Sequence, residues 1–385
     1  MAGQIIDRQD VVDVLSDLVR IPSVNPRMGS GTGEGAIARY LTDRLRGLEL
    51  TPIVTEVQAG RPNVLATVTG KPGEQHILFE AHTDTVPPSH GQADPFTPRL
   101  QGDRLYGRGS CDTKASIAAM FMALRSVLPL RERGATISVA FTIGEELGHE
   151  GAAHLAASGF RPDAAVVGEP TGLDIVTAHK GIARWRIVAT GRAAHSSHPE
   201  QGCNAIVKMA TVIRALEEQL IPRLRQHTHP LLGPPTLSVG RVEGGLQVNV
   251  VPDRCTIEVD RRLLPGETWT TVLGELEAAL APLRAEDPDL QVAIEEPYQL
   301  FGSMETPPDA PIVRLAREAV RRIDGEHPVR GVAFGTDAAE LSRAGIPCVV
   351  LGPGDIAQAH TSAEYVEIQQ VVKAAAIYRE MMLGA

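Results

Sequence analysis

The stretch HILFEAHTD, residues 76–84, joins a largely apolar run to polar residues at its end. A short, nearly continuous apolar run predicts a buried strand, and this one leads directly into His82-Thr83-Asp84. Residues two apart on an extended chain face the same side, so Asp84 can accept a hydrogen bond from the His82 ring nitrogen that faces away from a metal. Such a pair orients a metal ligand. The alternative is a surface strand end carrying two polar residues, and this stretch alone does not decide between them.

On both sides of this stretch the sequence alternates between strand and helix patterns. Alternation of this kind predicts an α/β domain with a mixed, largely parallel sheet and helices on both faces. The predicted strands are 63–68, 76–81, 135–143, 163–167 and 348–351. The predicted helices are 11–18, 34–48, 115–127 and 312–323.

After about Ala178 the pattern changes to longer strands and two long helices, which predicts a separate α+β unit with its own core. Its predicted strands are 181–190, 236–242, one within 248–263, and 291–296, and its helices are 204–219 and 267–283. The first pattern then resumes. We therefore predict a discontinuous main domain, 1–178 with 296–385, and an inserted domain, 179–295.

The composition narrows the classes of function. A chain of 385 residues is longer than one hydrophobic core usually organises. The net charge of −10 and the lack of a basic stripe argue against nucleic acid as a partner. No apolar stretch is long enough to span a membrane. Residues 1–9 show no secretory signal, so a cytoplasmic location is expected. The four cysteines are scattered without a CxxC pair, which excludes a zinc ribbon and favours free thiols.

The segment GRGSCDTK, residues 107–114, places Asp112 just before the predicted helix. An aspartate at a helix start is most often only an N-cap, and that is the preferred interpretation of this segment taken alone. The same position also favours an ionised carboxylate through the helix dipole. Asp112 is therefore a candidate metal ligand only in combination with other residues.

Two adjacent acids, Glu145 and Glu146, follow the predicted strand 135–143. Buried together without a cation, they would repel each other. Their side chains leave the backbone on different sides, so one can bind a metal while the other reaches a water molecule. A hydrolase separates Lewis acid and general base in this way. The alternative is a solvated turn, which a buried strand before it disfavours.

Further ligand-type residues follow two other predicted strands: Glu169 after 163–167, and His360 after 348–351 and a glycine-rich loop. Open α/β sheets place their sites beyond such strand ends. Two imidazoles and three carboxylates, with no thiolate, suit Zn²⁺, Co²⁺ or Mn²⁺. Their number suits two metal ions that share one carboxylate. Glu145 is then the remaining acid and the natural general base.

Taken together, HTDTV (82–86), GRGSCDTK, GEE (144–146), GEPT (168–171) and the late Ala359-His360 resemble the M20 metallopeptidases along essentially the whole chain. The resemblance implies that His82 and Glu169 hold one metal ion, that Glu146 and His360 hold the other, and that Asp112 bridges them. It also implies that Asp84 orients a ligand and that Glu145 is the base. A cis peptide is expected at Asp112–Thr113.

The inserted domain matches the family as well, as a ferredoxin-like lid and dimerisation unit. GRAAHSS, residues 191–197, is similar to the lid motif, so His195 is expected to reach the active site of a partner subunit and stabilise an oxyanion. Asn249 and Arg262 are similar to the contacts for a substrate carboxylate. On a strand Arg262 shares a face with Asp260 and Arg261 does not, which favours Arg262. The resemblance therefore also implies a homodimer formed through the inserted domain.

Within the family, AHKG (178–181), residues 352–361 and the glutamate at position 169 look most like the acetylornithine deacetylase branch. This implies hydrolysis of the amide bond of a small N-acyl amino acid, such as N-acetylornithine or N-succinyl-diaminopimelate, as in arginine biosynthesis. One alternative is a carboxypeptidase or dipeptidase with the same metal centre. The other is a binding protein that has lost catalysis, but every expected catalytic position is filled.

Overall fold

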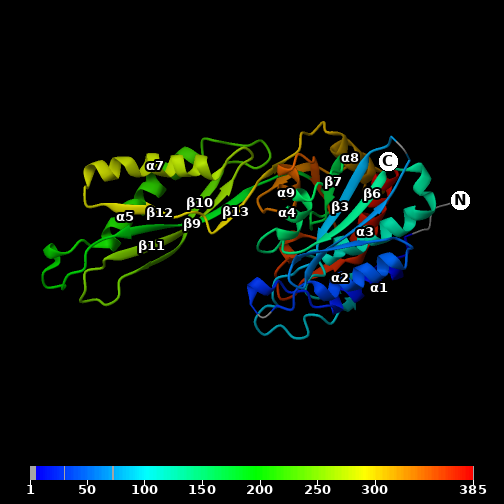
Figure 1. Cartoon of the computed structure of the whole chain (residues 1–385), viewed down its shortest axis with the longest axis horizontal. Coiled ribbons are helices and arrows are strands. Elements are labelled where there is room, and N and C mark those ends of the chain that lie inside the picture. Colours follow the sequence, from blue (N-terminus) through cyan, green and yellow to red (C-terminus); the bar gives the residue numbers. More distant parts are fainter. Residues whose placement is uncertain (1–5, 30, 72, 385) are drawn as a thin grey trace. The chain divides into compact units, whose positions relative to one another are not determined.

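The computed structural model describes residues 6–29, 31–71 and 73–384, and the chain folds into two compact units (Figure 1). The first unit comprises Met1–Thr177, Glu305–Arg330 and Thr336–Ala385, and the second comprises Ala178–Met304 and Gly331–Gly335. Strand pairing in the second unit continues beyond residue 295, because a strand at Gln299–Phe301 still pairs with it. The domain boundaries given above remain a prediction.

The described residues form a nine-stranded sheet in the order β1-β2-β6-β3-β7-β16-β8-β14, with β15 paired to β8. Its four central strands, β6, β3, β7 and β16, are parallel to one another. The pairs β1–β2, β2–β6 and β16–β8 are antiparallel. The predicted mixed, largely parallel sheet is therefore confirmed. The strands are β1 Ile53–Gln58, β2 Arg61–Val68, β3 His76–His82, β6 Thr136–Thr142, β7 Ala164–Val167, β8 Ile175–His179, β14 Met304–Glu305, β15 Val329–Val332 and β16 Cys348–Val350.

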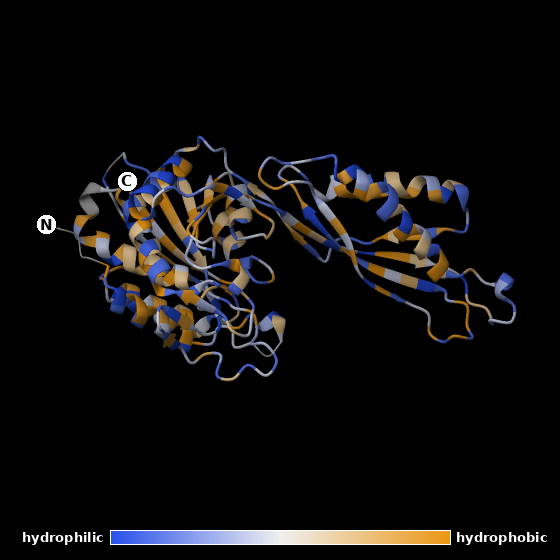
Figure 2. Cartoon of the chain, turned by 180° about the vertical axis from the view of Figure 1, so that it is seen from behind, coloured by the Kyte–Doolittle hydropathy of each residue, from blue (hydrophilic) through white to orange (hydrophobic). Residues whose placement is uncertain are grey.

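Helices cover both faces of this sheet, as predicted. Ile77 and Phe79 of β3 belong to the core under five helices, whereas Leu78 between them faces the other side and is equally buried. Burial of both faces explains why β3 is apolar almost throughout, and the central strands are strongly hydrophobic in Figure 2. On the Ile77 side lie α1 Arg8–Arg20, α2 Gly35–Arg46, α3 Lys114–Val127, α8 Pro311–Asp324 and α10 Ile368–Leu383. On the other side lie α4 Glu150–Ala157 and α9 Ala338–Arg343.

A small three-stranded sheet, in the order β17-β5-β4, lies next to the segment that carries Asp112. It consists of β4 Arg99–Gln101, β5 Arg104–Tyr106 and β17 Tyr365–Glu367. Because β5 leads into residues 107–112 and β17 follows Glu364, this sheet brings the chain near His360 beside the chain near Asp112. Short 3-10 segments lie at Pro26–Met28, Leu128–Arg133, Pro199–Gln201 and Ile356–Gln358.

The second unit is an antiparallel sheet in the order β10-β11-β9-β12, with β13 also paired to β9. Alternate residues of β9 enter its core, among them Trp185, whose ring lies 5.2 Å from that of Trp269. The residues between them, such as Arg184 and Arg186, lie on the opposite face. The elements are β9 Gly181–Thr190, β10 Thr236–Gly244, β11 Arg254–Leu263, β12 Gln291–Ile294, β13 Gln299–Phe301, α5 Ala205–Ala215, a π turn Leu216–Leu220, α6 Ile221–Leu224 and α7 Trp269–Glu286.

One predicted helix differs in the structure. The single helix expected at 204–219 is interrupted, because α5 ends at Ala215 and the π turn follows. The expectation that residues 1–9 carry no secretory signal concerns in part residues 1–5, which lie outside the described residues. Among the described helices, none combines the length and the apolar character that a membrane crossing requires. All four cysteines are free thiols.

Candidate metal centre

Three predicted ligands lie close together. His82 is at the end of β3, Glu169 follows the end of β7, and Asp112 is in the segment before α3. Each offers one donor atom, and these atoms lie within 4.8 Å of one another. The His82 Nε2 atom is 3.1 Å from Asp112 Oδ1 and 3.6 Å from Glu169 Oε1. All three residues are buried. Parallel strands β3 and β7 are neighbours, so their carboxyl ends necessarily present His82 and Glu169 side by side.

A second group consists of Asp112, Glu146 and His360, again with donor atoms within 4.8 Å. The His360 Nε2 atom lies 2.9 Å from Glu146 Oε2 and 3.3 Å from Asp112 Oδ2. Asp112 thus uses one oxygen in each group. A carboxylate shared between two groups of three donors is the arrangement that a two-metal centre requires.

Asp112 is not the N-cap of α3, so the interpretation preferred for its segment alone is wrong. The N-cap is Thr113, and the helix begins at Lys114. The Thr113 hydroxyl donates to the Gly168 carbonyl at 2.6 Å, which ties this segment to the end of β7 beside Glu169. The Asp112 side chain is therefore free for the centre. The Asp112–Thr113 peptide is cis, as expected from the resemblance.

Asp84 lies behind the centre and organises it from two directions. The Nδ1 atom of His82 is 3.0 Å from the Asp84 backbone carbonyl and 3.4 Å from its carboxylate. The carboxylate also accepts the backbone N–H groups of Gly144, Glu145 and Glu146 at 2.9, 3.1 and 3.2 Å. Burial opposes ionisation, but the hydrogen bonds from His82 and its other donors lower the pKa of Asp84. One charged side chain thus fixes both the histidine and the acidic turn.

Asn25 is a contributor that sequence patterns did not indicate. Its side-chain amide donates to Asp84 Oδ2 at 2.8 Å, and the residue is fully buried. Its own carbonyl oxygen accepts the backbone N–H of Arg27. The segment before α2 is thereby attached to Asp84, the residue that holds the centre from behind.

Glu145 belongs to neither group of donors, as predicted for a base. Its Oε2 atom lies 4.0 Å from His82 Nε2, and its Oε1 atom lies 4.0 Å from Nδ1 of His149. The turn that carries it begins with Gly144, whose φ of 82° suits glycine. A Cβ there would also approach Glu150 Oε2 to 2.1 Å. Glu145 lies toward His82 and His149, whereas Glu146 lies against His360, so the two acids have different partners.

The chemistry of the donor set fits divalent cations. Burial raises the pKa of Glu145, Glu146 and Glu169, the second to about 7, because charged carboxylates are costly to bury. Within the described part of the chain, Glu169 Oε1 is buried without a hydrogen-bond partner. Hydrogen bonds to Asp112 and Glu146 raise the pKa of His360 to about 10. Buried carboxyl groups that are costly to ionise alone, one of them with an unpaired oxygen, form a site that bound cations would complete.

Glu364 is a further residue that sequence analysis missed. Its buried carboxylate accepts Arg108 Nη1 at 2.6 Å and the backbone N–H groups of Gly109, Cys111 and Asp112 at 3.0, 2.9 and 3.1 Å. Because it holds three N–H groups between Gly109 and Asp112, it sets the path of the chain into Asp112. The only local signal was an acid four residues after His360.

Replacing Glu364 with Gln should destabilise the first unit. Arg108 is 1% exposed, and loss of one partner of a buried ion pair leaves an uncompensated charge, which costs about 3–5 kcal/mol. Urea denaturation, monitored by circular dichroism, measures the change in the free energy of unfolding. Glu367→Gln is the control, because its pair with Arg104 is exposed and should matter little. Equal effects of the two variants would contradict this role.

The remaining predicted residues, His195, Asn249 and Arg262, belong to the second unit. The loops of His195 and Asn249 are neighbours, since the Ser196 N–H donates to the Asn249 carbonyl at 3.0 Å and His195 pairs with Val250. Arg262 lies near the Leu263 end of β11, away from these loops, and its Nε donates to Asp260 at 3.1 Å. Arg261 is buried and bound to Glu267 and Glu275, so Arg262 is the arginine available at the surface.

Comparison with known proteins agrees with this geometry. Residues 78–384 match the family model described as peptidase family M20/M25/M40. Acetylornithine deacetylase from Myxococcus xanthus is 34% identical over 308 residues, 79% of each chain. The enzyme of the same name from Edwardsiella ictaluri is 33% identical over 341 residues, 87% of this chain and 86% of its own.

Solved structures share the fold. An aminopeptidase PepT from Bacillus cereus superposes with a TM-score of 0.80 at 24% identity, covering 98% of both chains. A Bacillus subtilis protein described as a dinuclear metal-binding peptidase of the M20 family gives a TM-score of 0.75 at 18% identity, covering 98% of this chain and 97% of its own. The family match over residues 78–384, together with relatives 33–34% identical over most of the chain, identifies this protein as a metallohydrolase of the M20/M25/M40 peptidase family.

Proposed function

We propose that this hydrolase cleaves the amide bond of an N-acylated amino acid that carries a free carboxylate, with N-acetylornithine as the first candidate. The observation that carries the reaction type is the pair of donor groups joined by Asp112, with Glu145 beside them but in neither. The substrate rests on the relatives named acetylornithine deacetylase. A role in arginine biosynthesis and a cytoplasmic location belong to this proposal.

The protein groups divide the work of hydrolysis. His82 and Glu169 would hold one divalent ion, Glu146 and His360 the other, and Asp112 both. When bound, the ions would polarise the scissile carbonyl and make a water molecule more acidic. Glu145 takes a proton from the attacking water and returns it to the leaving amine as the C–N bond breaks. The products are the free carboxylic acid and the amino acid. Zn²⁺ suits the donor set best, and Co²⁺ or Mn²⁺ would also fit.

The test is a comparison of N-acetylornithine, N-succinyl-diaminopimelate, other N-acyl amino acids and dipeptides with added Zn²⁺ or Co²⁺. Fastest turnover of N-acetylornithine is expected. Cleavage of dipeptides alone would overturn the deacylase proposal in favour of a dipeptidase or carboxypeptidase. A purified protein that takes up no divalent metal would refute the two-metal mechanism.

Substrate recognition is proposed to involve two copies of the chain. Arg254 and Arg262 are eight residues apart on β11, which corresponds to about 27 Å of extended chain. His195 and Asn249 lie beyond the Arg254 end, because Gly191 N–H donates to the Asp253 carbonyl. Arg262 and the His195–Asn249 pair therefore cannot contact one small substrate from the same chain. We propose that Arg262 binds the carboxylate in its own subunit, and that His195 and Asn249 reach the partner's site.

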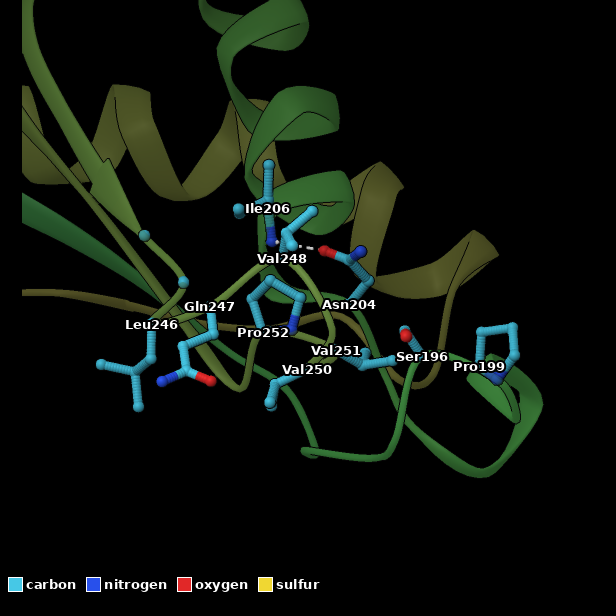
Figure 3. A pocket seen from close by; sticks show the side chains of 12 residues that line it. Ser196, Pro199, Asn204, Ile206, Leu246, Gln247, Val248, Val250, Val251 and Pro252 are labelled. Carbon is cyan, nitrogen blue, oxygen red and sulfur yellow. Dashed lines mark hydrogen bonds between the residues drawn. The ribbon is translucent and has the colours of Figure 1, made fainter.

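An exposed apolar surface of the second unit supports this dimer. Leu246 and Val248 are 91% and 101% exposed, and Ile206, Val207 and Val242 are also exposed. Figure 3 shows the hollow that these chain segments line, next to the start of α5, where Asn204 caps the helix by accepting the N–H of Ile206. The neighbouring strand β10 is at the end of the sheet order. Clustered apolar side chains beside an edge strand are typical of a surface that binds another chain.

The variant Val248→Asp should convert the dimer into monomers and abolish most activity, because each site would lose the partner's His195. Light scattering after size-exclusion chromatography measures the mass, and metal content should not change. Ile53→Asp is the control, since Ile53 is 61% exposed but lies on β1 of the first unit. A monomeric wild-type protein with full activity would exclude this proposal.

A further inference from the structure

The buried pair His149–Asp337 lies directly behind Glu145. The His149 Nδ1 atom is 2.7 Å from Asp337 Oδ1, and the side chains are 5% and 1% exposed. A histidine and an aspartate at this distance form a strong, charge-assisted hydrogen bond. Neither residue belongs to the two donor groups, and sequence patterns indicated neither.

The backbone places His149 where it is by an unusual turn. The N–H groups of Gly148 and His149 both donate to the Gly144 carbonyl, at 2.8 and 2.7 Å. This closes the chain back on itself, so His149 returns beside Glu145. His149 has a φ of 55°, in the left-handed region that a non-glycine residue enters at a cost of about 1–2 kcal/mol. Such conformations concentrate at functional sites.

The Glu145 carboxylate lies between two histidines. Its Oε2 atom faces His82 Nε2 and the donor groups, and its Oε1 atom faces His149 Nδ1, each at 4.0 Å. At 4.0 Å neither contact is a hydrogen bond, and the His149 Nδ1 atom already bonds to Asp337, so the imidazole acts on the Glu145 carboxylate through electrostatic attraction. Only the oxygen toward His82 is directed at the centre.

Asp337 also fixes the strand that leads to Glu145. Its second oxygen accepts the hydroxyl of Thr142, the last residue of β6, at 3.1 Å. The same hydroxyl approaches Glu80 at 2.5 Å. Asp337 at the start of α9 therefore holds both ends of the segment from Thr142 to His149, which contains the turn with Glu145.

We propose that His149 and Asp337 are positioning residues for Glu145: Asp337 fixes the imidazole of His149, and the imidazole directs the Glu145 carboxylate toward the metal centre. This inference rests on the proposed role of Glu145 as the base. The alternative is a buried ion pair that only attaches α4 and α9 to the sheet. The two differ in what should happen to turnover when stability and metal content are unchanged.

The test uses His149→Gln and Asp337→Asn, with His327→Gln as the matched control. His327 forms a similar contact with Asp174, at 2.9 Å, but lies outside the site. Both site variants should lower kcat for N-acetylornithine by about 10–100-fold, because a small misplacement of a catalytic group has effects of this size. KM and the metal content should stay within about twofold of wild type. The control should keep wild-type kcat.

A double variant separates positioning from general support. In a Glu145→Gln background, His149→Gln should have no further effect on the residual rate, because its role acts through Glu145. A further loss equal to that in the wild-type background would overturn the proposal. So would unchanged kcat in both single variants, or a loss of metal that accounts for the reduced rate.

Failure of the proposed function would be recognised separately. If the wild-type protein hydrolyses none of the substrates, the function is wrong, and crystal structures of the metal-loaded wild type and His149→Gln still decide the inference. A Glu145 side chain that changes orientation in the variant supports positioning. The same orientation in both structures overturns it.

Discussion

The variant Glu145→Gln is expected to bind metal like the wild type and to lose nearly all turnover. Glutamine has almost the same shape as glutamate but cannot accept the proton of the attacking water. General base catalysis typically contributes about 10²–10⁴-fold, so kcat should fall by that factor. Metal content should be unchanged, because Glu145 belongs to neither donor group.

Steady-state kinetics with N-acetylornithine and elemental analysis of the same preparation give the two measurements. Glu74→Gln, on an exposed surface of the first unit, is the control for a lost carboxylate. Turnover at the wild-type level would show that another group is the base. Loss of metal would place Glu145 among the ligands instead.

The second large effect is expected from Asp112→Ala, which should weaken both metal ions at once. Asp112 is the only residue shared by the two donor groups found among the described residues. Glu169→Ala should weaken one ion, since Glu169 belongs to a single group. Loss of a supporting residue around a metal typically costs about 10–100-fold in affinity, and loss of the shared ligand should exceed this for both ions.

Calorimetric titration with Zn²⁺ distinguishes these cases, because it gives the number of sites as well as their affinities. Wild type should bind two ions, Glu169→Ala one with high affinity, and Asp112→Ala none. Asp84→Asn serves as the comparison for an indirect effect, because Asp84 contacts the centre only through His82 and the turn. One intact high-affinity site in Asp112→Ala would contradict a shared carboxylate.

Three residues of the centre, His82, Glu146 and Glu169, could be predicted because they lie at or just after the ends of strands that the sequence reveals. His82 follows an apolar run, Glu146 follows another, and parallel strands bring such ends together. The N-cap interpretation of Asp112 was wrong because a helix start cannot be located to within one residue by pattern alone. Helix α10 was not predicted, although Ile368, Val371, Ala375, Tyr378 and Met382 have helical spacing and are all buried.

The supporting residues could not be predicted in the same way. Glu364 and Asp337 are far in sequence from the residues they hold, and Asn25 is 59 residues from Asp84. Their contacts are set by how loops distant in sequence meet in the folded chain, and no periodic pattern encodes that. His149 is close in sequence to Glu145, but a single histidine after a glycine is no signal without knowledge of the turn.

The packing of Trp185 against Trp269 has a consequence for spectroscopy. These are the only tryptophans of the chain, and both belong to the second unit, Trp185 in its core and Trp269 packed against that core, whereas every candidate metal ligand lies in the first. Intrinsic tryptophan emission is therefore a selective reporter of one folding unit. Stripping the metals with a chelator should lower the melting temperature seen by circular dichroism while the emission transition stays in place, so the two optical probes will report different stabilities for one molecule.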